Sequence, residues 1–213
     1  YLADAVLVAT GRIRNSDSLN LAAAGVKVGP GGQIRVDKHQ RTSQPHIWAL
    51  GDVSSDRLLK HVANAEARTV AANLLIDGGE LAATDHRYIP HAVFTEPQIA
   101  AVGATEEQLQ EWGTPYVEFK QRYADVAFGW ALEDEGHFVK LLADPRTWHL
   151  LGAHIIGPQA ATLIQPMIQA MSFGQTVQEL ARGQYWIHPA LTEVLENALL
   201  GLLKAPRPKE LDA

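Results

Sequence analysis

The sequence of 213 residues contains no cysteine, and this absence excludes two kinds of chemistry. Without thiols the chain forms no disulfide framework and performs no thiol–disulfide exchange by itself. A lack of disulfides also fits the reducing cytosol, so we expect a cytoplasmic protein.

Basic charge and long apolar runs are scarce as well. Lysine and arginine number 18 against 24 acidic residues, which gives a formal net charge of −6. This balance, with no basic run, argues against a nucleic-acid partner. No stretch reaches the roughly 18 consecutive apolar residues of a membrane-spanning helix, so we expect no membrane partner either. The 46% hydrophobic content suits a globular protein of one large domain or two small ones.

Sites for phosphate, metal ions and hydrolysis are not indicated. The densest glycine cluster, residues 29–32 (GPGG), predicts a hairpin-like turn and not a phosphate cradle. No G-x-S-x-G motif supports a Ser-His-Glu hydrolase. His86 and His91 are separated by a proline, and His149 and His154 flank a predicted strand without acidic partners nearby. We therefore expect no metal site.

The first part of the chain has the pattern of an α/β domain. Residues 5–10 and 47–50 are short apolar runs that predict buried parallel strands, and residues 33–37 alternate like a strand. Residues 19–24 predict a helical turn. Residues 58–76 predict a long Ala-rich helix that ends at an Asp-Gly-Gly sequence.

From about residue 86 the pattern changes to strands followed by helices. The strand-like segments, which predict an antiparallel sheet, are residues 92–95, 99–103, 116–123, 137–143 and 150–156. Helices are predicted from a capping box at 105–108, at 160–173 with a bend or restart at Pro166, at 176–182 and at 190–203. A sheet backed by helices is an α+β arrangement.

The run YWIHPALTE at residues 185–193 carries the most chemistry. Pro189 suits the first position of a helix, which would leave His188 at or just before the N-cap. Glu193 follows five residues later, and a histidine at the helix end can fold back over the first turn to meet it. A carboxylate there favours the imidazolium and fixes the ring, as suits an acid near neutral pH. The alternative is a histidine that only caps a helix beside a solvated glutamate.

Four motifs in order resemble the flavin-dependent pyridine nucleotide–disulfide oxidoreductases, a family that includes lipoamide dehydrogenase, glutathione reductase and mercuric reductase. Residues 184–193 are similar to its C-terminal His-Pro…Glu motif. Residues 8–12 (VATGR) resemble the segment that closes the nicotinamide-binding domain. Residues 47–52 (IWALGD) resemble the second flavin motif, and residues 91–103 the opening of the dimerisation domain.

This resemblance implies a domain organisation and cofactors. Residues 1–12 would end an NAD(P)-binding domain, and residues 13–84 would form the C-terminal part of an α/β FAD-binding domain. Residues 85–213 would form an α+β dimerisation domain, with an antiparallel sheet and helices. The implied cofactors are FAD and NADPH, and the implied assembly is a homodimer that reduces a low-molecular-weight disulfide.

The resemblance also assigns site residues. Gly51 and Asp52, at the end of a predicted strand, would belong to the flavin site, and Asp52 would bind the ribityl hydroxyls. Leu59, Lys60 and His61 would begin the next helix, where N–H groups and the positive dipole end favour negative charge on the reduced flavin. The alternatives are a turn-forming aspartate and a surface histidine.

The same resemblance implies catalytic roles for the C-terminal pair. His188 would protonate the departing substrate thiolate, and Glu193 would orient the imidazole. Both residues would serve the active site of the opposite subunit.

Further stretches resemble one branch of the family that reduces a low-molecular-weight disulfide: residues 50–55, 58–64, 164–174 and 181–189. Lipoamide dehydrogenase, glutathione reductase and mercuric reductase remain alternatives, although residues 206–213 lack the cysteine pair expected of mercuric reductase. The family's glycine-rich fingerprints and cysteine pair are not in this chain, which begins without methionine. We expect a piece of a longer protein, and an isolated chain that is an inactive dimerisation module.

Overall fold

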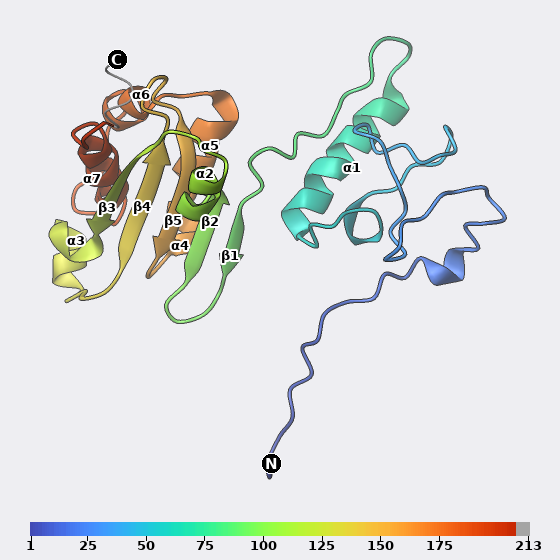
Figure 1. The fold of residues 1–213 in the computed structure, drawn as a ribbon, viewed down its shortest axis with the longest axis horizontal. Helices are drawn as coiled ribbons and strands as arrows, with labels where there is room; N and C mark the ends of the chain where they lie inside the picture. The colour runs from blue at the N-terminus through green and yellow to red at the C-terminus, as the bar shows by residue number, and fades with distance from the viewer. Residues whose placement is uncertain (208–213) are drawn as a thin grey trace. The chain divides into compact units, whose positions relative to one another are not determined.

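The computed structural model describes residues 1–207, which divide into two compact units. The first unit is Tyr1–His86, and the second begins at Arg87. Each is coloured as a separate part of the spectrum in Figure 1, from blue to cyan for the first and from green to red for the second.

The second unit is built on a five-stranded antiparallel sheet with the strand order β1-β2-β5-β4-β3. The strands are β1 (His91–Val93), β2 (Ile99–Gly103), β3 (Val117–Arg122), β4 (Phe138–Ala143) and β5 (Leu150–Ile156). All five predicted strands are present, and the bounds of β2 and β5 match the prediction. Figure 1 shows the sheet with helices against it. The predicted α+β arrangement is confirmed.

Short helices complete this unit. They are α2 (Glu106–Glu111), α3 (Ala127–Ala131), α4 (Ala160–Leu163), α5 (Gln165–Phe173), α6 (Val177–Arg182) and α7 (Glu193–Leu202), with a 3₁₀ turn η3 (Tyr123–Asp125). The predicted capping box opens α2, and a second one opens α6. Pro166 lies in the first turn of α5 and separates it from α4, as predicted.

A large apolar core fixes α7 against the sheet. The helix packs on β3 and β4 with its face of Val194, Leu195, Ala198, Leu199 and Leu202, all completely buried. Positions that recur at intervals of three and four residues lie on one side of a helix, so one face meets the sheet. The helix therefore holds the C-terminal part of the chain in place.

The helix α7 begins later than predicted. Thr192 is its N-cap, and Pro189 lies in the bend that precedes it, so the prediction that Pro189 opens the helix was wrong. The reason is the carboxylate of Glu193, which binds both the N–H of Ala190 and Nδ1 of His188. These bonds hold the preceding segment as a loop across the helix end.

The first unit has little regular structure. It contains the 3₁₀ turns η1 (Asp17–Leu19) and η2 (Gly51–Val53), and the helix α1 (Lys60–Leu75), which confirms the predicted helix. A small cluster of Val26, Ile34 and Ala49 forms its apolar core.

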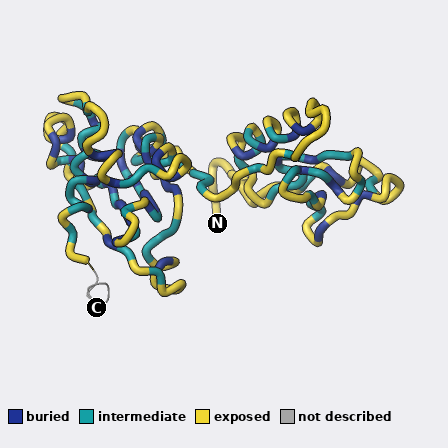
Figure 2. The backbone as a smooth tube through the Cα atoms, turned by 90° about the horizontal axis from the view of Figure 1, so that it is seen from above, coloured by how far each residue is buried: buried dark blue, intermediate teal, exposed yellow. Residues whose placement is uncertain are grey.

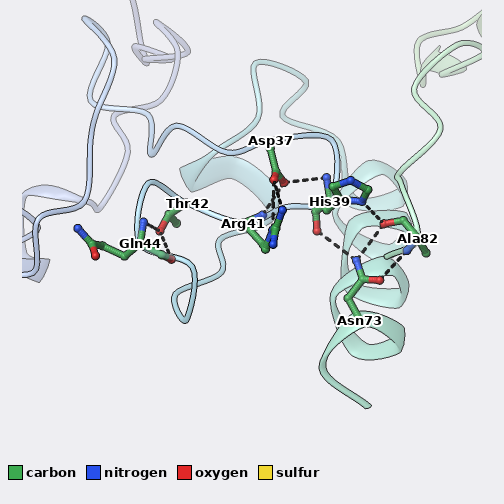
Figure 3. Close-up of polar contacts among 7 residues, drawn as sticks. All are labelled: Asp37, His39, Arg41, Thr42, Gln44, Asn73 and Ala82. Atoms are coloured by element: carbon green, nitrogen blue, oxygen red, sulfur yellow. Dashed lines mark hydrogen bonds and ion pairs between the residues drawn. The ribbon is translucent and has the colours of Figure 1, made fainter. Parts of the chain in front are cut away.

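Polar contacts supply much of what holds this unit together. In Figure 3, Asp37 accepts hydrogen bonds from the N–H groups of His39 and Arg41. The GPGG segment forms the predicted turn, in which Gly29 N–H donates to the carbonyl of Gln33 at 2.8 Å. Turns also replace the predicted helical turn after η1 and end at Gly25, whose φ is +69°.

The predicted strands of the first unit were wrong. Residues 5–10 and 47–50 and the segment 33–37 form at most isolated bridges, such as Arg41 with Trp48. Residues 1–13 are exposed throughout (Figure 2). A parallel strand needs neighbouring strands for its hydrogen bonds, and residues 1–207 provide none beside these segments.

Candidate functional site

His188 and Glu193 meet at the start of α7. Nδ1 of His188 lies 2.8 Å from Oε1 of Glu193, and Oε2 of the same carboxylate accepts the N–H of Ala190 at 3.2 Å. The His188 side chain is 69% exposed and the Glu193 side chain 17%, so the imidazole faces solvent while the carboxylate that binds it is largely covered. The contact predicted from the sequence is present, and the catalytic role remains a prediction.

The Glu193 carboxylate binds one of the two nitrogens of the His188 ring. The hydrogen bond from His188 lowers the pKa of Glu193, and the Ala190 N–H acts in the same direction, while partial burial opposes both. The carboxylate is therefore ionised near neutral pH and accepts a hydrogen at Nδ1. With Nδ1 bound to the carboxylate, Nε2 is the ring nitrogen left for a contact with another group.

The segment before His188 is fastened to the end of α6. Nε2 of Gln184 donates to the carbonyl of Leu180 at 3.1 Å, and Nε1 of Trp186 donates to the carbonyl of Ala181 at 3.2 Å. Two side chains thus bind carbonyls that a helix end leaves without partners within the helix. Sequence reasoning missed this support, because a glutamine and a tryptophan carry no recognised C-cap signal.

The second candidate site is Asp52 in the turn η2. Its Oδ2 lies 2.8 Å from a guanidinium nitrogen of Arg12, and its carbonyl accepts from Nε of Arg14 at 3.1 Å. A cavity of about 570 Å³ opens here, lined by Arg12, Ile13, Arg14, Asn15, Leu19, Asp52, Val53 and Leu58. The sequence predicted Asp52 but neither arginine.

The start of α1 carries the other predicted cofactor residues. Leu59 is the N-cap, and Lys60 and His61 are the first two helical residues, as predicted. Leucine offers no side-chain acceptor to the first-turn N–H groups, which give this end its positive character. Lys60 contacts Asn64 on its own helix. The role of these residues toward a cofactor remains a prediction.

These residues fit part of a flavin site. Asp52 supplies an acceptor for vicinal hydroxyls beside a cavity, and a helix start favours negative charge on a ligand. Asp52 and α1 lie in the first unit, while His188 and Glu193 lie in the second. Within residues 1–207, no group of three or more His, Asp or Glu side chains is arranged to hold a metal ion. None of the helices in that range has the length and hydrophobicity needed to cross a bilayer.

Comparison with known sequences gives matches along most of the chain. Residues 89–199 match the family model described as "Pyridine nucleotide-disulphide oxidoreductase, dimerisation domain", and residues 1–69 match "Pyridine nucleotide-disulphide oxidoreductase". Mycothione reductase from Mycobacterium tuberculosis is 59% identical over 94% of this chain and 44% of its own length. Dihydrolipoyl dehydrogenase from Cupriavidus necator is 36% identical over 94% of this chain and 42% of its own length.

Solved structures give the same result. The HOCl-induced flavoprotein disulfide reductase RclA from Escherichia coli superposes with a TM-score of 0.84 at 29% identity, over 92% of this chain and 45% of that one. LpdA from Mycobacterium tuberculosis superposes with a TM-score of 0.81 at 27% identity, over 89% of this chain and 41% of that one. The chain spans less than half the length of these relatives. With a dimerisation-domain match that covers more than half of its residues, the chain belongs to the pyridine nucleotide-disulphide oxidoreductase family.

Proposed function

We propose that this chain is the C-terminal part of an FAD-dependent and NADPH-dependent disulfide reductase whose substrate is mycothiol disulfide. The branch of the family indicated by residues 50–55, 58–64, 164–174 and 181–189 is that of mycothione reductase. The 59% identity to mycothione reductase, against 36% to dihydrolipoyl dehydrogenase, supports this substrate. The observation that carries the proposed reductase activity is the His188–Glu193 pair, in which a carboxylate orients an exposed imidazole.

The division of labour along the chain is part of this proposal. Residues 1–12 would end the NAD(P)-binding domain, residues 13–84 would belong to the FAD-binding domain, and residues 85–213 would form the dimerisation domain. Of these, 208–213 lie outside the described residues. The chain would contribute Gly51, Asp52 and Leu59–His61 to the flavin site and His188 and Glu193 to the catalytic site.

The chemistry follows from the two nitrogens of His188. FAD, when bound, would supply the redox chemistry, which is the transfer of electrons from the nicotinamide toward the disulfide substrate. A thiolate from another part of the protein would attack one sulfur of the substrate and form a mixed disulfide with it. The substrate S–S bond breaks, and the other sulfur leaves as a thiolate that takes the proton of Nε2 of His188. Glu193 accepts the hydrogen of Nδ1 throughout, so the ring keeps its orientation in both protonation states. Because the chain has no cysteine, the thiol that exchanges with the substrate belongs to another part of the protein.

Dimerisation and location complete the proposal. The second unit would pair with a second copy, so that His188 and Glu193 serve the flavin and disulfide of the opposite subunit. The match to a dimerisation domain supports this arrangement. We propose a cytoplasmic homodimer that has no nucleic-acid or membrane partner.

Two alternatives differ in substrate or in activity. The complete protein could act on lipoamide, glutathione disulfide or Hg(II), because the acid pair and Asp52 would serve those reactions equally well. The chain alone, without cysteine, would be an inactive dimerisation module.

The test is NADPH oxidation by the complete flavoprotein with mycothiol disulfide, glutathione disulfide, lipoamide and Hg(II) in parallel. Fast turnover of mycothiol disulfide alone supports the proposed substrate. A preference for lipoamide or Hg(II) would contradict the proposed substrate but leave the proposed role of His188 in place. A complete protein that binds no flavin would refute the proposal.

A further inference from the structure

Glu66 is buried in the first unit although it is an acid. Only 2% of the residue is exposed, and it lies in the second turn of α1 (Lys60–Leu75). The other buried polar residues described in the first unit, Ser16, Gln40, Thr42 and Asn73, are uncharged. Removing a carboxylate from water is unfavourable unless its oxygens are hydrogen-bonded, so the partners of Glu66 indicate what it is for.

Glu66 binds the residue before Asp52. Its Oε2 accepts the N–H of Gly51 at 2.6 Å, and its Oε1 lies 3.1 Å from Nε2 of His86. Gly51 is itself buried, and its N–H lies in the low-dielectric interior where an unpaired donor is costly. The carboxylate therefore supplies a partner that the main chain of this turn needs.

The helix also approaches Gly51 closely. A Cβ added at Gly51 would lie 3.3 Å from the Cβ of Ala63, and the φ of +71° suits glycine. Ala63 and Glu66 are three residues apart and lie on the same face of α1. One face of the helix therefore fixes Gly51 both by a hydrogen bond and by close packing.

The position of Asp52 follows from that of Gly51. The carbonyl of Gly51 accepts the N–H groups of Ser54 at 2.9 Å and Ser55 at 2.8 Å, and Arg14 binds the carbonyl of Asp52. The main chain on both sides of the Asp52 side chain is thus fixed by hydrogen bonds. The Asp52 carboxylate therefore projects from a turn whose main chain has little freedom to move.

We infer that Glu66 is a positioning residue for the flavin. It holds the Gly51–Asp52 turn against α1, so that the Asp52 carboxylate is oriented before the ribityl hydroxyls arrive. Glu66 acts through the turn and does not touch the flavin. A group that is oriented beforehand loses less conformational freedom on binding, and the ligand is held more tightly. This inference rests on the proposed role of Asp52.

The test uses the complete flavoprotein with Glu66→Leu and Glu66→Gln, and measures the dissociation constant of FAD by the recovery of flavin fluorescence on dilution. Leucine has a similar size but no acceptor for Gly51 N–H. Loss of a hydrogen bond to a charged group predicts FAD binding weaker by about tenfold or more. Glutamine keeps an amide oxygen for Gly51 N–H, so Glu66→Gln should restore most of the affinity.

Asn73→Leu is the matched control, because Asn73 is a second buried polar residue on the same helix. Its Nδ2 donates to the carbonyl of Ala82 at 2.9 Å, and its Oδ1 accepts the N–H of Ala82 at 2.8 Å (Figure 3). This variant also loses buried hydrogen bonds and should lower the Tm, but it leaves the Gly51 turn intact. FAD affinity should stay at the parental value.

A further variant tests the turn without changing the buried acid. Ala63→Val adds two methyl groups against Gly51 and should weaken FAD binding even if Glu66→Leu does not fold. Parental FAD affinity in Glu66→Leu or Ala63→Val would overturn the inference. So would equal loss in Glu66→Leu and either Glu66→Gln or Asn73→Leu. A parent that carries no flavin would instead refute the proposed function.

Discussion

The two units of this chain are held together in different ways. The second unit has a sheet whose five strands all pair within it, and an apolar core that includes completely buried Leu141, Leu195 and Leu199. The first unit has a core of Val26, Ile34 and Ala49, and depends on polar side chains that bind main-chain groups. The second unit therefore contains all the strand partners and core residues of its sheet, while the first contains apolar runs without partner strands.

The largest effect should come from the core of the second unit. Leu195→Ala removes a completely buried side chain between α7 and the sheet and should lower the free energy of unfolding by about 2–5 kcal/mol. Hydrogen exchange read by mass spectrometry should show the loss of protection in β3, β4 and α7. Val26→Ala is the corresponding core variant in the first unit and should lower the free energy of unfolding by a smaller amount. Equal loss of protection in both units after Leu195→Ala would contradict their separate stabilisation.

The next largest loss of stability should come from removing Arg14, which links several segments of the first unit by hydrogen bonds. Arg14 binds the carbonyls of Asp52 and Ser55 and the carboxylate of Asp56. Arg14→Ala should cost about 1–3 kcal/mol, because hydrogen bonds from a charged donor to partly buried carbonyls are lost. Chemical denaturation measures it, with exposed Arg35→Ala as control. If both variants unfold at the same denaturant concentration, polar contacts do not hold this unit.

A local test addresses the helix ends of the second unit. The hydroxyl of Thr176 accepts a hydrogen bond from the N–H of Glu179, and the carboxylate of Glu179 accepts one from the N–H of Thr176. Thr176→Ala should lower stability by about 1 kcal/mol, as for other N-caps. Thermal unfolding would show it as a lower Tm, whereas Ser172→Ala, on the exposed side of α5, should leave the Tm unchanged. A Tm as high as the parent's in Thr176→Ala would show that packing alone holds α6.

The smallest effect is a pH dependence confined to the second unit. Burial lowers the pKa of His154, with the charge of Lys140 acting in the same direction, although the hydrogen bond to the Ala104 carbonyl opposes them. The unfolded chain then binds the proton more readily, so stability is fully present above a pH of about 6.5 and falls as the pH is lowered toward the folded pKa. His154→Gln keeps a donor without titrating and should flatten this slope. Identical slopes in parent and variant would refute the assignment.

The sequence predicted the second unit well because its signals are local. The strand-like segments 99–103 and 150–156 and the capping box at Thr105 each span only a few residues, and β2, β5 and α2 formed where they were predicted. The apolar run at residues 47–50 misled, because such a run predicts burial but does not supply the strands beside it.

The candidate sites were predictable to different degrees. The pairing of His188 with Glu193 followed from a short motif, but the start of α7 did not, because the side chain of Glu193 binds Ala190 and reshapes the segment before the helix. Glu66 gave no signal in the sequence, since a single glutamate in an Ala-rich helix is usually exposed. Its burial depends on Gly51, which is 15 residues away in sequence.

The most direct test of the proposed function is disulfide turnover by the complete flavoprotein carrying His188→Gln, with the rate of flavin reduction by NADPH measured in the same preparation. We predict turnover lower by about 10²- to 10⁴-fold, the contribution of a well-placed general acid, with flavin reduction unchanged. Unchanged disulfide turnover would show that His188 is not the acid and would contradict the proposed mechanism.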